Sequence, residues 1–195
     1  MPRVSQEHLD ARRRQILDAA RTCFARDGFH ATSMQDVLRE ADLSAGAVYR
    51  YFGGKDEIIL AIARDALSRL AEVLVDSAEQ DEPPPPDEVM GRIFTVLEEL
   101  GSKGFSRLAV QIWSEALRNE AIGDEVRAAY SGLREAVYDL VRAYQAQGRV
   151  DAAADAQEVG RVLVAIVPGF VLQHAIMGDV DAAQFTRGLR ALLST

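Results

Sequence analysis

The sequence has few of the residues on which catalysis or metal binding usually depends. It contains one cysteine, Cys23, and three widely separated histidines, His8, His30 and His174. A single cysteine excludes an internal disulfide, and its apolar neighbours indicate a buried small side chain rather than a redox sensor. No HExxH, CxxC, GxSxG or phosphate-binding glycine loop occurs. We therefore expect neither an enzyme nor a metal site, and we predict no cofactor.

Long hydrophobic runs are also lacking. The N-terminal segment MPRVSQEHLDARRRQ contains no apolar stretch, so we expect no signal peptide. The longest apolar run, residues 162–172, is shorter than the roughly 18 residues that a membrane-spanning helix needs. Hydrophobic residues nevertheless make up 48% of the chain, which is ample for a packed core. We expect a cytoplasmic protein that does not associate with membranes.

Positive charge is scarce overall but is concentrated near the N-terminus. The chain carries 22 Lys and Arg against 30 Asp and Glu, a formal net charge of -8. Residues 1–55 hold nine basic and seven acidic side chains and are net positive, so the rest of the chain carries a net charge of -10. This division is typical of a nucleic-acid-binding segment joined to an acidic domain that DNA repels.

Residues 32–55, TSMQDVLREADLSAGAVYRYFGGK, are the most informative segment. Thr32 and Ser33 can cap a short helix, and Asp36 completes a capping box with Ser33. After a tight turn, Ser44 can cap a second short helix. Two short helices joined in this way have the layout of a helix-turn-helix, whose second helix enters the DNA major groove.

The order of these residues resembles the N-terminal domain of the TetR family of transcriptional regulators. The resemblance is carried by residues 16–20, Phe24, Gly28, Phe29, Thr32, Ser33, residues 41–44, Gly46, Tyr49, Tyr51, Phe52 and Lys55. It implies a three-helix DNA-binding domain followed by a helical domain that binds an effector and dimerises.

The second helix of the motif departs from the commoner family pattern. Ala45 stands where a basic residue is frequent, and Arg50 stands where histidine or tyrosine is frequent. Arg50 can bind a guanine edge through two hydrogen bonds, and Tyr49 and Tyr51 can donate to phosphates. Lys55 occupies a position that regularly contacts phosphate in the family. The predicted DNA-binding residues are Thr32, Ser33, Gln35, Ser44, Ala45, Gly46, Ala47, Tyr49, Arg50, Tyr51 and Lys55.

The apolar periodicity is helical throughout, without the alternation of β-strands. Residues 55–78 form a long amphipathic helix, which a segment with four consecutive prolines brings to an end. Turn signals place further helices at about 88–101, 104–118, 121–147, 155–177 and 181–193. We predict an all-α chain of about nine helices. A helix-turn-helix domain covers residues 1–54, with the motif itself at about 33–52, and an effector-binding and dimerisation domain covers residues 55–195.

The predicted helix at 155–177 is apolar on nearly every side and must therefore be covered all round. In the TetR family, the last two long helices pair with their copies in a second subunit. We therefore predict a homodimer that presents two recognition helices to a palindromic operator, with half-sites about 34 Å apart. The residues expected at the dimer interface are Val162, Ile166, Phe170, Gln173, Phe185, Leu189 and Leu192.

The resemblance also implies an effector cavity behind the helix at 55–78. The candidate lining residues are Phe94, Phe105, Leu108, Ile112, Trp113, Leu117, Tyr130, Tyr138, Phe170 and His174, although such side chains at helical spacing are more often plain core. Few charges lie near them, which favours a lipophilic effector. The leading hypothesis is a repressor that such a molecule releases from its operator. In the alternative, the second domain responds to a protein partner, which its acidic helices and the proline segment would suit equally well.

Overall fold

The computed structural model describes residues 6–102 and 104–193, and every regular element in these ranges is an α-helix. In chain order these are α1 (Gln6–Asp27), α2 (Met34–Ala41), α3 (Ala45–Tyr49), α4 (Lys55–Ala78), α5 (Pro86–Gly101), α6 (Phe105–Arg118), α7 (Glu120–Ala146), α8 (Ala156–Ile176) and α9 (Ala182–Leu193). The predicted all-α fold of about nine helices is confirmed, with boundaries close to those expected from the turn signals. The predicted outer domain limits, residues 1 and 195, lie outside the described residues.

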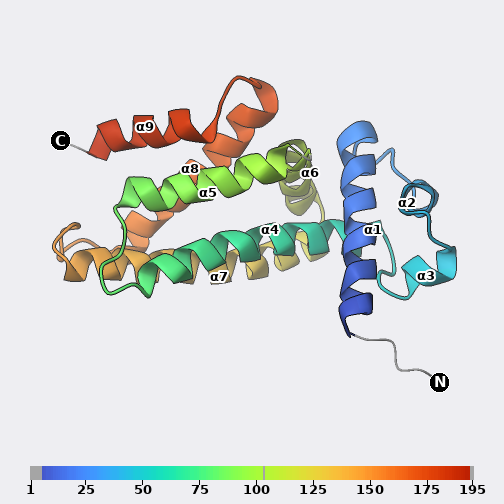
Figure 1. Cartoon of the computed structure of the whole chain (residues 1–195), viewed down its shortest axis with the longest axis horizontal. Coiled ribbons are helices and arrows are strands. Elements are labelled where there is room, and N and C mark those ends of the chain that lie inside the picture. The colour runs from blue at the N-terminus through green and yellow to red at the C-terminus, as the bar shows by residue number, and fades with distance from the viewer. Residues whose placement is uncertain (1–5, 103, 194–195) are drawn as a thin grey trace.

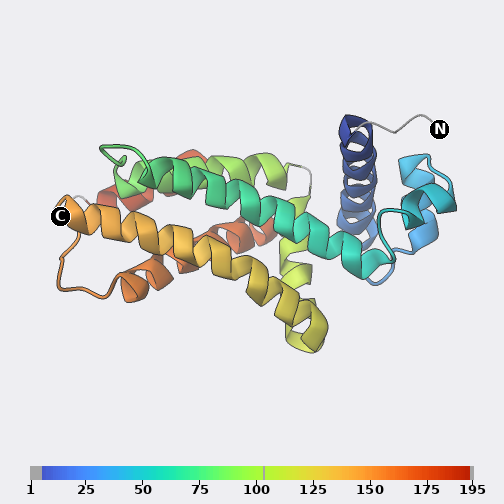
Figure 2. The same ribbon diagram turned by 90° about the horizontal axis from the view of Figure 1, so that it is seen from below.

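The helices form two groups of unequal size (Figure 1). The head, α1 to α3, lies at one end of the molecule, and the body, α4 to α9, forms an elongated bundle. α4 runs from the head into the body, where it lies beside α7 in both Figure 1 and Figure 2. The long amphipathic helix predicted for residues 55–78 therefore connects the two parts, as its single apolar stripe requires.

The centre of the body is built from the apolar faces of α4, α5 and α7. Their largest fully buried side chains include Ile62, Leu74, Phe94, Leu97 and Tyr144. Burying a side chain of this size contributes about 1.5–3 kcal/mol relative to leaving it in water. α8 approaches α7 closely at Gly160, where an added Cβ would lie 2.5 Å from Cδ1 of Tyr138.

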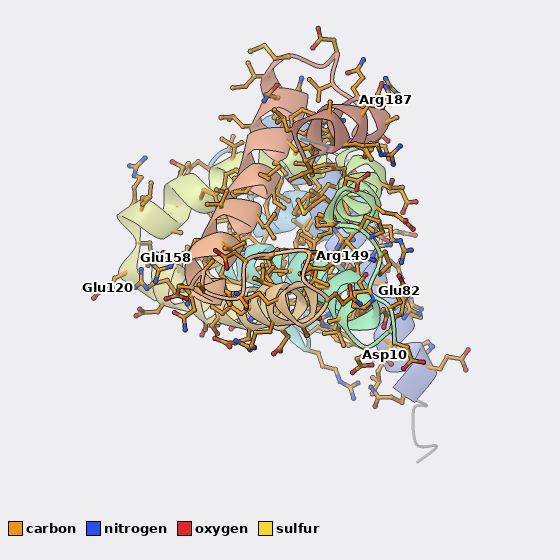
Figure 3. All side chains as sticks on the ribbon, turned by 90° about the vertical axis from the view of Figure 1, so that its left-hand side faces the viewer. Asp10, Glu82, Glu120, Arg149, Glu158 and Arg187 are labelled. Atoms are coloured by element: carbon orange, nitrogen blue, oxygen red, sulfur yellow. The ribbon has the colours of Figure 1, made fainter. Side chains whose placement is uncertain are left out.

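The proline segment is fixed to the end of the bundle. Tyr144 donates its hydroxyl hydrogen to the carbonyl of Pro84 at 2.8 Å, and Arg149 Nη1 donates to the carbonyl of Pro83 at 2.7 Å. Arg149 also lies 3.4 Å from a carboxylate oxygen of Glu82, and Figure 3 shows the two side chains together. The proline segment is thus bound to the bundle rather than a free spacer, and Pro86 is already the first residue of α5.

α8 is the most apolar helix and one of the least covered. By length and composition alone it could cross a membrane, since an 18-residue window has a mean hydropathy of 1.7, but only 17% of that window is buried. The expectation from sequence considers only the uninterrupted apolar run at residues 162–172, whereas the whole helix is 21 residues long. Figure 3 shows α8 running along one side of the bundle from Glu158. Val162 and Ile176, on its outer face, are 65% and 66% exposed.

Candidate DNA-binding surface and effector cavity

α2 begins at a complete capping box. Ser33 Oγ accepts from the backbone amide of Asp36 at 3.3 Å, and Asp36 Oδ2 accepts from the amide of Ser33 at 2.9 Å. Both donors would otherwise be unpaired at the helix start. Hydrogen bonds from Ser33 hold the pKa of the Asp36 carboxyl below its ordinary value, because they favour the ionised form.

The turn between α2 and α3 is tight and well fixed. Asp42 ends α2 in the left-handed region, with φ of 52°, and its amide donates to the carbonyl of Arg39. Ser44 then caps α3 by accepting from the amide of Ala47 at 3.3 Å. From α1, Gln15 Nε2 donates to the carbonyl of Ala41 at 2.8 Å, which fixes the end of α2.

α3 is oriented by two inward side chains. Val48 is fully buried and Phe52, four residues later, is 4% exposed, as their spacing predicts. The opposite side of α3 faces solvent and carries Tyr49, which is 51% exposed, and Arg50. The head therefore presents a short exposed helix, which is the arrangement of a major-groove recognition element.

The head rests on α6 of the body. The backbone amide of Phe29 donates to Gln111 Oε1 at 2.8 Å, and His30 Nε2 lies 2.7 Å from Glu115 Oε1. α1 also approaches the start of α6 closely: a Cβ added to Gly104, which has a φ of 79°, would lie 2.4 Å from Cβ of Ala25. The loop between α1 and α2 is therefore held by side chains from one face of α6.

Another face of α6 lines an apolar cavity in the body. The cavity encloses about 40 Å³ between α4, α5, α6, α7 and α8. A second, smaller cavity of about 20 Å³ adjoins it and shares four lining residues, Leu70, Leu133, Val164 and Val167. Since one water needs roughly 10–15 Å³, cavities of these volumes hold only a few atoms.

The cavity has one polar feature. Trp113 Nε1, on α6, donates to the hydroxyl oxygen of Tyr130, on α7, at 3.1 Å. Both side chains are partly buried, and burial raises the pKa of the Tyr130 hydroxyl above its ordinary value.

Comparison with known proteins assigns the chain to a family. Residues 16–62 match the family described as bacterial regulatory proteins, tetR family, and residues 92–195 match the BetI-type transcriptional repressor C-terminal domain. The chain belongs to the TetR family. It is a DNA-binding transcriptional regulator, not an enzyme, as the sequence predicts.

Individual TetR relatives agree with this assignment. The chain is 44% identical over 73 residues to the HTH-type transcriptional repressor Rv1474c of Mycobacterium tuberculosis, a match that spans 37% of this chain and only 39% of that one. Among solved structures, Salmonella enterica GusR is 25% identical, with a TM-score of 0.79 and coverage of 99% of this chain and 97% of that one. FadR from Bacillus subtilis, solved in complex with stearoyl-CoA, is 16% identical, with a TM-score of 0.69 and coverage of 93% and 97%. That last likeness is one of fold alone.

The predicted DNA-binding residues of this TetR head fall into three groups. Those exposed on the surface of α2, α3 and their N-caps are Ser33, Gln35, Ser44, Ala45, Gly46, Tyr49 and Arg50; those partly buried are Ala47, Tyr51 and Lys55. Thr32 alone is buried, at 1% exposure. Its Oγ1 donates to the carbonyl of Gly28 at 2.8 Å, so it closes the loop after α1, and its contact with DNA stays a prediction. Ser33, the next residue, is the N-cap, which directs the preceding side chain inward.

Lys55 is also engaged within the head. Its Nζ donates to the carbonyls of Phe29, Thr32 and His30 at 2.9, 3.1 and 3.3 Å, and lies 4.7 Å from the centroid of the Phe29 ring. A lysine ammonium has three donors, and here all three have backbone acceptors. Lys55 therefore ties the first residue of α4 to the loop between α1 and α2, and its predicted contact with a DNA phosphate stays a prediction.

Four of the candidate effector residues line the main cavity, namely Phe105, Ile112, Trp113 and Tyr130. The others do not. Phe94 and Phe170 pack against each other and against Phe185, with ring centroids 5.0–5.4 Å apart, and Leu108 and Tyr138 are buried in the core. Leu117 is 89% exposed, and His174 lies against Phe170, with ring centroids 6.1 Å apart.

α8 provides one wall of the cavity, but through residues other than those predicted. Val164, Val167, Pro168 and Val171 all line it, together with Leu70 of α4. From this helix the sequence predicts Phe170 and His174 as lining residues. An apolar helix that is covered on every side can also line a cavity, so the composition of α8 is the signal for this wall.

The contacts of Lys55 predict a role in stability. Lys55→Met should lower the free energy of unfolding by about 1–3 kcal/mol, because it removes the donor from three backbone carbonyls, two of them in partly buried hydrogen bonds. Urea unfolding without DNA, followed by circular dichroism, measures this. The control is Arg39→Met. The Arg39 side chain is 78% exposed and forms one ion pair, with Asp36 at 3.4 Å, so its loss should change the free energy of unfolding by less than about 0.5 kcal/mol. Equal effects of the two substitutions would show that Lys55 does not position α4.

Proposed function

We propose that this protein is a homodimeric repressor that binds a palindromic operator in the cytoplasm and leaves it when a small lipophilic molecule enters the cavity. One observation carries the proposal: α6 contacts the head through Gln111 and Glu115 and lines the cavity with Ile112 and Trp113. We divide the chain into a DNA-binding domain over residues 1–54 and an effector-binding and dimerisation domain over residues 55–195.

The proposed DNA surface is the exposed side of the helix-turn-helix. Arg50 is exposed and free to bind a guanine edge through two hydrogen bonds. Tyr49 can donate to a phosphate, and Gln35 can reach an adenine. Ala45 and Ala47 offer methyl groups for contact with thymine. Base recognition thus rests on few side chains, and Gly46 lets the backbone of α3 approach the groove.

Two substitutions separate the roles of these residues on DNA. Arg50→Ala should cost about 1–3 kcal/mol on the preferred operator and should relax the preference at one base pair. Tyr49→Phe should weaken binding to all duplexes by a similar factor, about fivefold, because it removes one hydrogen bond that carries no sequence information. Fluorescence anisotropy on matched and single-mismatch duplexes measures both. Arg142→Ala, an exposed arginine of the body, is the control and should bind like the parent. Unchanged operator affinity in both head variants would contradict the proposed surface.

A second copy of the chain is the proposed cover of α8. Its exposed apolar residues recur as Val162, Leu172 and Ile176, with the small residues Ala165 and Gly169 between them. This spacing follows one side of a helix. A monomer would leave that stripe in water, and contiguous exposed apolar surface of this kind marks an interaction site.

One of the residues predicted from sequence for the dimer interface is removed from the proposed interface. Val162, Gln173 and Leu192 are exposed and Ile166 is half-buried, so all four remain in the proposed interface. Phe185 and Leu189 are partly buried against the core and can meet a second copy only through their outer edges. Phe170 is fully buried within the protomer, between Phe94 and Phe185, and is removed from the interface.

Charges placed on α8 test the dimer. The double substitution Val162→Asp/Ile176→Asp should convert the protein to a monomer, because burying unpaired carboxylates at the interface costs several kcal/mol. Sedimentation velocity at micromolar concentration gives the mass. Leu117→Asp introduces a carboxylate at another exposed apolar residue, on α6, and should leave the dimer intact. A dimer that survives both variants would rule out α8 as the interface.

The small size of the cavity implies that an effector must displace side chains when it binds. A lipophilic molecule cannot enter about 40 Å³ without displacing side chains of α6 or α8. Binding therefore favours a second arrangement of these helices, and the ligand shifts the equilibrium by its differential affinity for the two. The stearoyl-CoA complex of FadR, a regulator of similar fold, supports an effector with an apolar chain that enters the cavity. Since the proline segment is bound by Tyr144 and Arg149, it no longer favours the alternative of a protein partner.

A screen against lipophilic compounds tests this mechanism. Compounds that raise the melting temperature should also lower operator affinity, since a ligand that binds the folded state stabilises it by mass action. The double variant Gln111→Ala/Glu115→Ala should still bind such compounds but should lose their effect on operator affinity, because both polar links between α6 and the head are gone. A variant that responds like the parent would exclude coupling through these two side chains.

A further inference from the structure

The polar end of the cavity has an unused donor. Trp113 Nε1 donates to the Tyr130 hydroxyl oxygen at 3.1 Å, so that oxygen acts as an acceptor in this bond. A phenol can both accept and donate. Within the described part of the chain, no acceptor for the Tyr130 hydroxyl hydrogen is found. Trp113 thus fixes the position of a hydroxyl whose own hydrogen is available to a ligand.

The rest of the cavity wall disfavours charge. Its described lining residues are aliphatic, apart from Phe105, Trp113 and Tyr130, and include no charged side chain. An ionised carboxylate or ammonium taken from water into such surroundings would lose several kcal/mol without a partner to offset it. A neutral oxygen acceptor loses far less and regains a hydrogen bond from the phenol.

We propose that the cavity binds a neutral, mostly apolar molecule with one oxygen acceptor, such as an ester, thioester or ketone carbonyl, and that the Tyr130 hydroxyl donates to that oxygen. The inference rests on the proposed function, because it names the chemical class of the effector for the same cavity. Free fatty acids and alkylamines are disfavoured, because no described lining residue offers a counter-charge. Tyr130 is the specificity-determining residue, and Trp113 is the positioning residue that orients it.

Trp113 also provides a fluorescence signal for measuring ligand binding. It is the single tryptophan of the chain and lies in the cavity wall, so its fluorescence reports occupancy directly. Three probes share a similar chain but differ at one end: methyl octanoate is a neutral acceptor, octanoate is an anion, and 1-octene is neutral without an oxygen. Titration of the full-length protein at pH 7 gives a dissociation constant for each.

Tyr130→Phe is the variant that matters, because it removes the hydroxyl and keeps the ring. It should weaken the binding of methyl octanoate by about fivefold, which corresponds to the loss of one hydrogen bond. The affinity for 1-octene should be unchanged. Unchanged 1-octene binding also shows that the variant is folded with its cavity intact. Tyr138→Phe is the matched control: Tyr138 is buried on the same helix but does not line the cavity, and both affinities should equal those of the parent. Octanoate should bind the parent at least about tenfold more weakly than its ester.

The outcomes separate this inference from the proposed function. Equal affinity of the parent and Tyr130→Phe for methyl octanoate, or octanoate binding as tightly as the ester, would overturn the role of Tyr130 and leave the effector cavity standing. If none of the three probes alters Trp113 fluorescence in the parent, the cavity is not a lipophilic site. In that case the inference and the effector part of the proposed function are both wrong.

Discussion

The attachment of the head to α6 is the interaction on which the proposed function depends. The bond between the Phe29 amide and Gln111, at 2.8 Å, and the His30–Glu115 pair, at 2.7 Å, hold the loop that precedes the helix-turn-helix. Residues between and beside these two on α6, such as Ile112 and Trp113, line the cavity. Because one helix contacts both sites, the proposed mechanism transmits side-chain displacement in the cavity through α6 to the loop that precedes the helix-turn-helix. Lys55 strengthens this arrangement by tying α4, the other connection between head and body, to the same loop.

The composition of α8 imposes a second constraint. Its apolar residues cannot all be covered by one chain, since the inner side already packs on α5, α6 and α7. The inner side supplies the cavity wall through Val164 and Val167, and the outer side presents Val162 and Ile176 to a second copy in the proposed dimer. The cavity and the interface therefore lie on opposite sides of one helix, so an effector that moves α8 would also change how two heads are spaced.

Local features of this fold are predictable from sequence, and close packing is not. The caps at Ser33 and Ser44 and the inward pair Val48 and Phe52 follow from side-chain chemistry and helical spacing, and all appear as expected. The burial of Thr32 does not follow from sequence, because a buried threonine and an exposed one can have the same neighbours in the chain. The cavity could be only partly predicted: it is the place where side chains from five helices fail to fill space, and Phe94 or Phe170 differ from Phe105 only in how completely neighbours cover them.

The central claim is that two copies of this chain read one palindrome. Selection of binding sequences from random duplexes, followed by native mass spectrometry of the selected complex, tests it most directly. The account predicts enrichment of an inverted repeat with half-sites about one helical turn apart, bound by an even number of chains. A single chain on a non-repeated site, or no enrichment above random duplex, would contradict it.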